Sequence, residues 1–205
     1  MALFKRKREA PPSADPQEEQ FVRQQARTSI RPGFMPLAQV VEGVVELVTY
    51  DPAMSMQADR AEHICREEWD RRTAELARPG PRSPSDDVRV GAAFERLRRD
   101  GYIAEMNIGV DQSDAISELR DRLDKTPGAR GYVFFHVQDA ERLAEEPGDL
   151  YIGFGSRPGD DAGGLEAGRA AASAFAAEDL PVTWNGAVAT RILLPGLVWR
   201  RPLPG

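Results

Sequence analysis

Hydrophobic residues in the first half of the chain recur at the spacing of a helix. Between Pro36 and Tyr50, apolar side chains fall at positions i, i+3, i+4, i+7, i+8 and i+11, starting at Leu37. This period predicts an amphipathic helix, and Pro36 suits its first turn because proline has no N–H to lose there. The segment is therefore expected to bury one valine-rich face.

Two further helices are predicted in the same half. One has Ser55 as its N-cap and ends before the Pro-Gly-Pro stretch at 79–81. The other starts at Ser85 and ends at Gly101, since serine favours N-caps and glycine commonly follows a helix C-terminus. Residues 17–100 are thus predicted to form a helical region.

After Gly101 the pattern changes, and short runs of β-forming residues alternate with helical segments. The strongest run, Gly131-Tyr-Val-Phe-Phe-His-Val137, combines aromatic and β-branched residues as strands do. We expect an α+β fold, in which a helical N-terminal region is followed by a four- to five-stranded, helix-covered sheet. The expected strands are 102–108, 131–137, 150–154, 191–194 and 197–199, and the expected helices are 114–123, 140–146 and 165–177.

Three regions divide the chain. Residues 1–16 hold three prolines among charged and small side chains, which predicts a disordered leader with too little apolar surface to bury. Residues 17–100 are the helical region, and residues 101–205 are the α+β domain. We expect these last two regions to pack as one unit.

The composition excludes several classes of protein. A hydrophobic content of 41% with 29% charged residues fits a folded domain and excludes a disordered tail protein. No apolar run approaches the ~20 residues needed to cross a bilayer, so no membrane contact is expected. The basic N-terminal cluster is not followed by an apolar stretch, so no export signal is expected. Because Cys65 is the single cysteine, the chain is expected in a reducing cytoplasm.

The negative charge lies in the second half of the chain. Residues 1–100 carry 17 basic and 17 acidic side chains, whereas residues 101–205 carry 10 basic and 16 acidic ones. A polyanion would meet this acidic field, so nucleic acid is not expected as a partner. The charge therefore disfavours a winged-helix-like unit built from residues 85–99 and the strand after them.

His136 is the stronger of the two histidines as a candidate for chemistry. On the strand expected at 131–137, alternation places His136 and Gln138 on one face. Asp139 follows at the junction with the next helix, where aspartate commonly caps. Two interpretations stay open. In one, His136 only ends a strand beside a capping aspartate; in the other, Asp139 orients it as an acid or base, with Arg191 as a third catalytic candidate.

Aromatic and polar side chains near the last strands are candidates for ligand binding. Tryptophan and arginine often form binding hot spots, but one tryptophan per strand is also what a sheet packed under helices requires. Both alternatives stay open. The candidate ligand-binding residues are His136, Gln138, Tyr151, Trp184, Asn185 and Arg191.

No metal and no cofactor is expected. A structural zinc site needs four Cys or His ligands, and the chain holds two histidines and one cysteine. The glycine-rich stretch 153–159 follows a strand, as phosphate-binding loops do. Its spacing does not match G-x-G-x-x-G, however, and Asp160 and Asp161 would repel phosphate, so a flexible loop is expected.

Several motifs occur in a fixed order along the chain: Arg31-Pro-Gly-Phe34, Asp100-Gly-Tyr-Ile-Ala104, Gly131-Tyr-Val-Phe-Phe-His-Val-Gln-Asp139, Asp149-Leu-Tyr-Ile-Gly-Phe-Gly155 and Leu180-Pro-Val-Thr-Trp-Asn-Gly186. Together they resemble those of an uncharacterised bacterial family, known as a domain of unknown function, over about residues 20–200. Its members commonly carry C-C-x-x-C-G after the first strand, where residues 107–113 of this chain hold no cysteine. The resemblance thus implies no metal or redox role there. Asn185 stands where the family usually has Asp, and Ala140 where it usually has Thr.

Three hypotheses for function follow. The first is a cytoplasmic, non-enzymatic binding or interaction module, which takes a protein or a small molecule through its α+β half, because no complete catalytic set can be assembled from the chain. The second is a hydrolase-type enzyme centred on His136 with Asp139 and Arg191. The third is a nucleic-acid-binding protein. The resemblance implies a bacterial cytosolic setting and supplies no activity.

Overall fold

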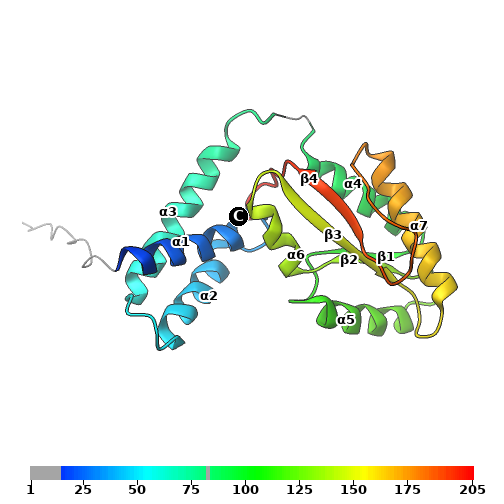
Figure 1. Ribbon diagram of the computed structural model, residues 1–205, viewed down its shortest axis with the longest axis horizontal. Coiled ribbons are helices and arrows are strands. Elements are labelled where there is room, and N and C mark those ends of the chain that lie inside the picture. The colour runs from blue at the N-terminus through cyan, green and yellow to red at the C-terminus, as the bar shows by residue number, and fades with distance from the viewer. Residues whose placement is uncertain (1–14, 82–83) are drawn as a thin grey trace, which may run out of the picture.

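The computed structural model describes residues 15–81 and 84–205 (Figure 1). They form an α+β fold of seven α-helices, one 3-10 helix and a four-stranded mixed sheet, as predicted. Most of the predicted leader, residues 1–14, lies outside the described residues. The elements are α1 (Pro16–Ile30), α2 (Leu37–Tyr50), α3 (Ala58–Leu76), α4 (Asp86–Arg99), β1 (Ile103–Met106), α5 (Gln112–Lys125), β2 (Tyr132–Phe135), α6 (Val137–Glu141), the 3-10 helix η1 (Arg142–Ala144), β3 (Gly148–Gly155), α7 (Asp161–Ala177) and β4 (Ile192–Leu197).

Helices α1, α2 and α3 pack together at one end of the molecule (Figure 1). The valines of α2 face this group's core as the helical period predicts, with Val40, Val44 and Val48 buried. Helix α3 starts at Ala58 after Gln57, so the prediction of Ser55 as its N-cap is wrong. Ser55 lies three residues ahead of the helix in the connecting loop, where its hydroxyl donates to the carboxylate of Glu18 on α1.

Helix α1 was covered only by the general prediction of a helical region. Its buried positions are Val22, Ala26 and Ile30, one apolar side chain per turn, which is a weaker signal than the valines of α2. Asp15 caps the helix by accepting the N–H of Gln17, and Pro16 occupies the first turn. The ordered helix therefore begins inside the segment predicted as leader.

The sheet has the strand order β1-β2-β3-β4. Strands β1 and β2 are parallel and are joined through α5, whereas β3 runs antiparallel to both of its neighbours, β2 and β4. Side chains of alternate residues point to opposite faces, so Phe135 joins one core and Phe134 the other. The sheet thus has two faces with different covers.

One face of the sheet is fully covered, and the other is not. Helices α4 and α7 pack on the first face, where Phe94 and Phe175 meet at a ring-centroid distance of 5.6 Å. Helix α5 packs on the second face, mainly against β1 and β2. Part of β3 and β4 on that face is therefore left without a covering helix among the described elements.

Two strand ends differ from the sequence prediction. Strand β2 ends at Phe135 and His136 becomes the N-cap of α6, so Val137 is helical and not the last strand residue. The two segments predicted at 191–194 and 197–199 form one strand, β4, that includes Pro195 and Gly196. Proline is tolerated there because β4 is an edge strand.

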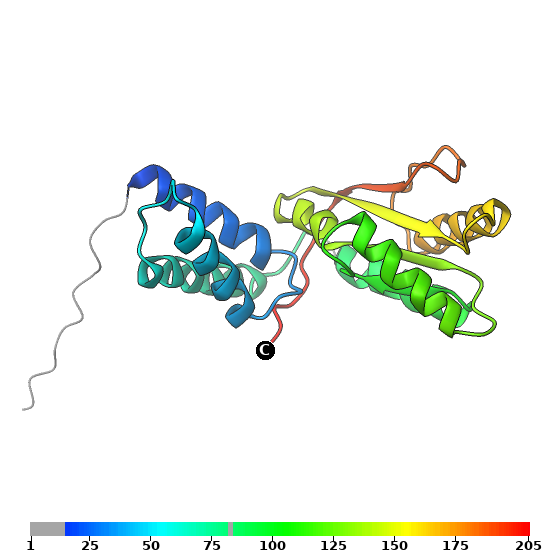
Figure 2. The same ribbon diagram turned by 90° about the horizontal axis from the view of Figure 1, so that it is seen from below.

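The C-terminal segment returns to the helical end of the molecule, as Figures 1 and 2 both show. Trp199 is fully buried, and its ring N–H donates to the carbonyl of Pro32 at 2.9 Å. Arg72 of α3 is also buried and donates to the carbonyl of Trp199 at 2.8 Å. A side chain at Gly33 would lie only 3.1 Å from the backbone of Arg201. The loop after α1 and the last residues therefore fit tightly together.

Candidate functional site

His136 lies in a reciprocal capping arrangement with Asp139. Its Nδ1 accepts the backbone N–H of Asp139 at 3.3 Å, while the carboxylate of Asp139 accepts the backbone N–H of His136 at 3.3 Å. The ring Nε2 lies 3.0 Å from the same carboxylate oxygen, Oδ2. With Nδ1 as an acceptor, the neutral ring carries its proton on Nε2, facing the carboxylate.

The protonation of His136 is controlled by its surroundings. Burial lowers the pKa of His136 below its ordinary value, because the charged ring loses hydration. The carboxylates of Asp139 and Asp111 raise this pKa, and the guanidinium groups of Arg191 and Arg142 lower it. Since the lowering causes prevail, the ring stays neutral at neutral pH.

Arg191 completes this cluster from the start of β4. It donates to Oδ2 of Asp139 and to the carbonyl of Tyr151, the latter at 2.7 Å. Its guanidinium lies 5.5 Å from the centre of the Tyr151 ring, and that of Arg142 lies 5.4 Å from the same ring. The Nε of Arg191 is buried and has no hydrogen-bond partner among the described residues. Arg191 therefore holds α6 to the edge of the sheet.

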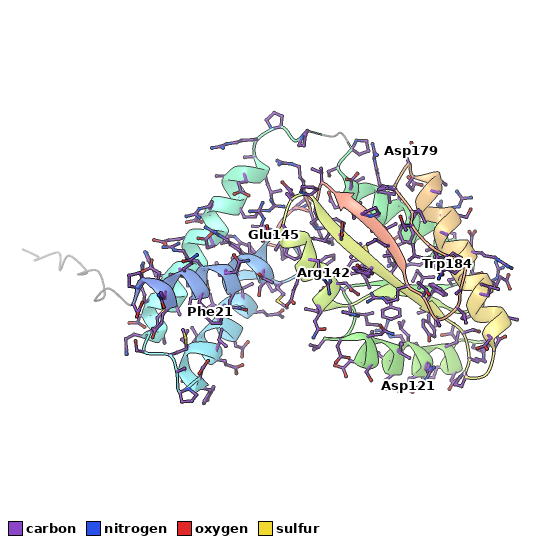
Figure 3. The ribbon with its side chains drawn as sticks, in the orientation of Figure 1. Phe21, Asp121, Arg142, Glu145, Asp179 and Trp184 are labelled. Carbon is purple, nitrogen blue, oxygen red and sulfur yellow. The ribbon has the colours of Figure 1, made fainter. Side chains whose placement is uncertain are left out.

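The remaining candidate residues lie apart from this cluster. Gln138 is exposed on α6. Trp184 donates its ring N–H to the carbonyls of Ala187 and Thr190, and Asn185 caps the same turn through Ala187. In Figure 3, Trp184 and Arg142 lie on opposite sides of the β3–β4 pair. The sequence candidates thus form two groups: a cluster of buried His136 and Asp139 with partly exposed Tyr151 and Arg191, and a separate Trp184–Asn185 turn.

A pocket opens where α5 leaves the sheet uncovered. It has a volume of about 270 Å³ and lies between α5, the loop from β3 to α7, and the loop that precedes β4. Of the sequence candidates, Arg191 alone is among the described residues that line it. The cluster around His136 and the pocket therefore share one side chain.

The floor of the pocket pairs two aromatic rings with two glycines. A Cβ at Gly153 would lie 2.5 Å from the Phe134 ring, and a Cβ at Gly155 would lie 2.4 Å from the Tyr132 hydroxyl oxygen. The antiparallel register sets Phe134 opposite Gly153 and Tyr132 opposite Gly155. These four residues were not predicted as site residues. The available signal was the alternation of glycine on one strand and of aromatic residues on the next.

Tyr132 combines deep burial with a free polar group. Its side chain is 97% buried, because only 3% of its surface is exposed. Its hydroxyl makes no hydrogen bond with any described residue. The Tyr102 hydroxyl also lacks a partner but is fully enclosed, whereas the Tyr132 hydroxyl is accessible. Because Tyr132 lines the pocket, its hydroxyl opens into that space.

Charged side chains surround the pocket. Arg120 comes from α5 and Arg157 from the β3–α7 loop, and neither forms an ion pair within the described residues. Asp160 also lines the pocket, but its carboxylate accepts the N–H of Gly163 at 2.9 Å and the hydroxyl of Ser156 at 2.7 Å. These two bonds and the charge of Arg157 lower the pKa of Asp160, and the bond from Gly163 makes Asp160 the N-cap of α7. The prediction of a flexible loop at 153–159 is wrong for residues 153–155, which pair with β2 as the end of β3; together with the loop residues 156–159 they line the pocket.

Other kinds of site find no support in the described parts of the chain. Residues 15–81 and 84–205 contain no group of three or more His, Cys, Asp or Glu side chains arranged to hold a metal ion. Within the same ranges no helix is long and apolar enough to cross a membrane. Cys65 is buried, and desolvation raises the pKa of its thiol to about 11.

Comparison with known proteins gives one family and no further relative. Neither the search of curated proteins nor the search of solved structures gives a match. The family model described as Domain of unknown function (DUF6891) matches residues 15–203, which include all the helices and strands described above. The chain therefore belongs to this family of unknown function, as its motifs predict.

Proposed function

We propose that the protein is a non-enzymatic binding module that takes a small molecule in the pocket between α5, the β3–α7 loop and the loop before β4. The observation that carries the proposal is the free hydroxyl of Tyr132, a side chain that is 97% buried and lines the pocket. This hydroxyl is accessible from the pocket and has no partner among the described residues. It is therefore available to hydrogen-bond a molecule bound there.

The size and position of the pocket support the same proposal. A volume of about 270 Å³ lies just below the ~300–1,000 Å³ of small-molecule sites, which suits a compact ligand. Aromatic side chains form the floor of the pocket, and charged side chains and backbone groups form most of the remaining lining. It lies in the α+β half, to which we assigned binding. A cytoplasmic setting is part of the proposal, supported by the use of a single cysteine.

The hydrolase alternative has weaker support. A general base needs a free ring nitrogen within reach of its substrate. In His136, Nδ1 accepts a backbone N–H and Nε2 faces Asp139, so both nitrogens are engaged. The ring is also 95% buried, since 5% of the residue surface is exposed. His136 therefore serves local structure in this proposal.

A fragment screen followed by amide NMR of the full chain tests the proposal. We expect bound fragments to shift the amide signals of Gly155 and Ser156 at the pocket wall. Ala189 lines the pocket and is exposed, so Ala189→Trp should fill the opening and abolish these shifts. Ala38→Trp, on an exposed position of α2, is the matched control and should leave binding unchanged. Shifts that persist in Ala189→Trp, or a library without any binder at these amides, would contradict the proposal.

A further inference from the structure

We propose that the ligand of this pocket is a small organic carboxylate with a flat apolar body, held by Arg120, Arg157 and the Tyr132 hydroxyl. This inference rests on the proposed binding function and names the chemical class of the ligand. It is drawn from the donors left free around the pocket, from the walls between them, and from the space available.

The free polar groups around the pocket are donors. Arg120 and Arg157 have no carboxylate partner among the described residues, and the one hydrogen bond of Arg157 is a long one, 3.4 Å, to the carbonyl of Leu123. Guanidinium groups bind carboxylates through paired N–H donors. The Tyr132 hydroxyl can donate a third hydrogen bond from the floor. A carboxylate would satisfy all three groups.

The acidic residues of the lining do not cancel this preference. Both oxygens of Asp160 are occupied, by the Gly163 N–H and the Ser156 hydroxyl, and its charge faces the N-terminus of α7. Asp161 is exposed in the first turn of the same helix. Arg191 is neutralised by Asp139. Arg120 and Arg157 balance the charges of Asp160 and Asp161, and Arg157 acts electrostatically on Asp160. The preference for an anion therefore rests on the free N–H donors of the two arginines and not on the net charge of the pocket.

The walls and the volume favour an organic anion over inorganic phosphate. The α7 N-terminus, which could otherwise bind phosphate, already has Asp160 as its cap. Phe134 and Ile116 line the pocket and present apolar surface that phosphate would leave unmatched. A volume of about 270 Å³ equals that of roughly nine liquid waters. A compact ligand of the size of benzoate fits this space.

Three probes of nearly equal shape test the charge. Benzoate, benzamide and benzylammonium are titrated separately into the full chain at low ionic strength, and the amides of Gly155 and Ser156 are followed by NMR. We expect saturable shifts for benzoate with a Kd of about 1 mM or tighter, and at least tenfold weaker binding of the other two. Inorganic phosphate is titrated as a fourth probe and should bind more weakly than benzoate.

Variants then assign the donors. Arg120→Gln and Arg157→Gln should each weaken benzoate binding about tenfold, because each removes a charge-assisted hydrogen bond. Arg169→Gln is the matched control, since Arg169 is exposed on α7 outside the pocket lining. Tyr132→Phe should weaken binding severalfold, whereas Tyr50→Phe on an exposed position of α2 should have no effect.

The outcomes separate the inference from the proposed function. Equal binding of benzamide, tighter binding of benzylammonium or phosphate, or full benzoate affinity in both arginine variants would overturn the carboxylate assignment. The binding function would survive each of these results. If no probe binds while other library fragments shift the same amides, the carboxylate inference alone fails. If no probe and no fragment shifts these amide signals, both the carboxylate inference and the proposed binding function fail.

Discussion

Replacing His136 by asparagine should remove a specific pH dependence from the stability of the protein. Burial lowers the pKa of His136, with Arg191 and Arg142 acting in the same direction. In the unfolded chain the ring returns to its ordinary pKa of about 6.5. Between these two values the unfolded state binds more protons than the folded state, so the free energy of unfolding falls as the pH falls. Above pH ~7 the ring is neutral in both states, and this contribution is fully present.

The size of the effect follows from the linkage relation. If the folded ring stays neutral, lowering the pH from 7.5 to 5.5 should reduce the free energy of unfolding by about 1.4 kcal/mol. The reason is that the histidine takes up a proton in the unfolded state only, which stabilises that state. In a chain of this length that corresponds to a shift in Tm of roughly 2–4 °C per kcal/mol. Asp139 favours proton uptake by the folded ring, and any such uptake makes the loss of stability smaller than about 1.4 kcal/mol. The loss stops once the pH is below the folded pKa.

The assay compares variants by denaturant unfolding at several pH values between 5.5 and 7.5. Asparagine is a good N-cap, so His136→Asn should keep an acceptor for the Asp139 N–H while removing the titrating ring. We expect a shallower pH dependence in this variant than in the wild-type protein. Glu141, whose pKa is raised by burial, contributes equally to both proteins and cancels in the difference. His63→Asn is the control, because the His63 side chain is 56% exposed.

Two results would refute this reasoning. Parallel stability curves for wild type and His136→Asn would mean that the folded and unfolded pKa values of His136 do not differ. A wild-type protein that becomes more stable relative to the variant as the pH falls would mean that the attraction of Asp139 outweighs burial. The sign of the difference therefore decides between the two electrostatic causes.

Three further predictions concern packing and can be checked by thermal and denaturant unfolding. Gly153→Ala should destabilise the folded protein by about 1–3 kcal/mol, because its Cβ would lie 2.5 Å from the Phe134 ring. Gly43→Ala, in open space on α2, should instead stabilise it by about 0.5–1 kcal/mol. Equal effects of the two substitutions would contradict the argument. Glu68→Gln should lower the free energy of unfolding by about 1–3 kcal/mol, because this buried carboxylate pairs with three partly exposed arginines of α1 and α3. No change in stability would mean that solvent screens these ion pairs. Trp199→Ala should cost about 3–5 kcal/mol through the cavity it leaves, and a loss below 1 kcal/mol would show that the C-terminal segment is not anchored there.

The helices and strands were predictable where one local signal dominated. The valine period of α2 and the Ser85 to Gly101 boundaries of α4 agree with the structure because these segments carry both a period and end signals. The end of β2 was not predictable from strand propensity. Val137 favours a strand, but the reciprocal hydrogen bonds between His136 and Asp139 start a helix there. Local capping thus overrode propensity.

The candidate site was predictable only in part, because its residues come together through the sheet order. The proximity of Asp139 to Arg191 depends on β3 lying between β2 and β4, which no local pattern reveals. The pocket joins Arg120 on α5 to Arg157 after β3 for the same reason. The glycines of β3 gave a local signal, but their meaning depends on the aromatic residues opposite them.

The course of the C-terminal segment explains how the helical end and the sheet end are held together. Trp199 packs in the same core as the residues of α4 and α7, while its ring N–H binds the loop that follows α1. Arg72 of α3 binds the carbonyl of this same residue. Separating the two ends would expose a tryptophan and leave a buried guanidinium without its acceptor, and each of these costs free energy. The connection therefore depends on a few residues that follow β4, while Arg191 directly precedes the same strand, so that the pocket and the helical end share β4 as their common support.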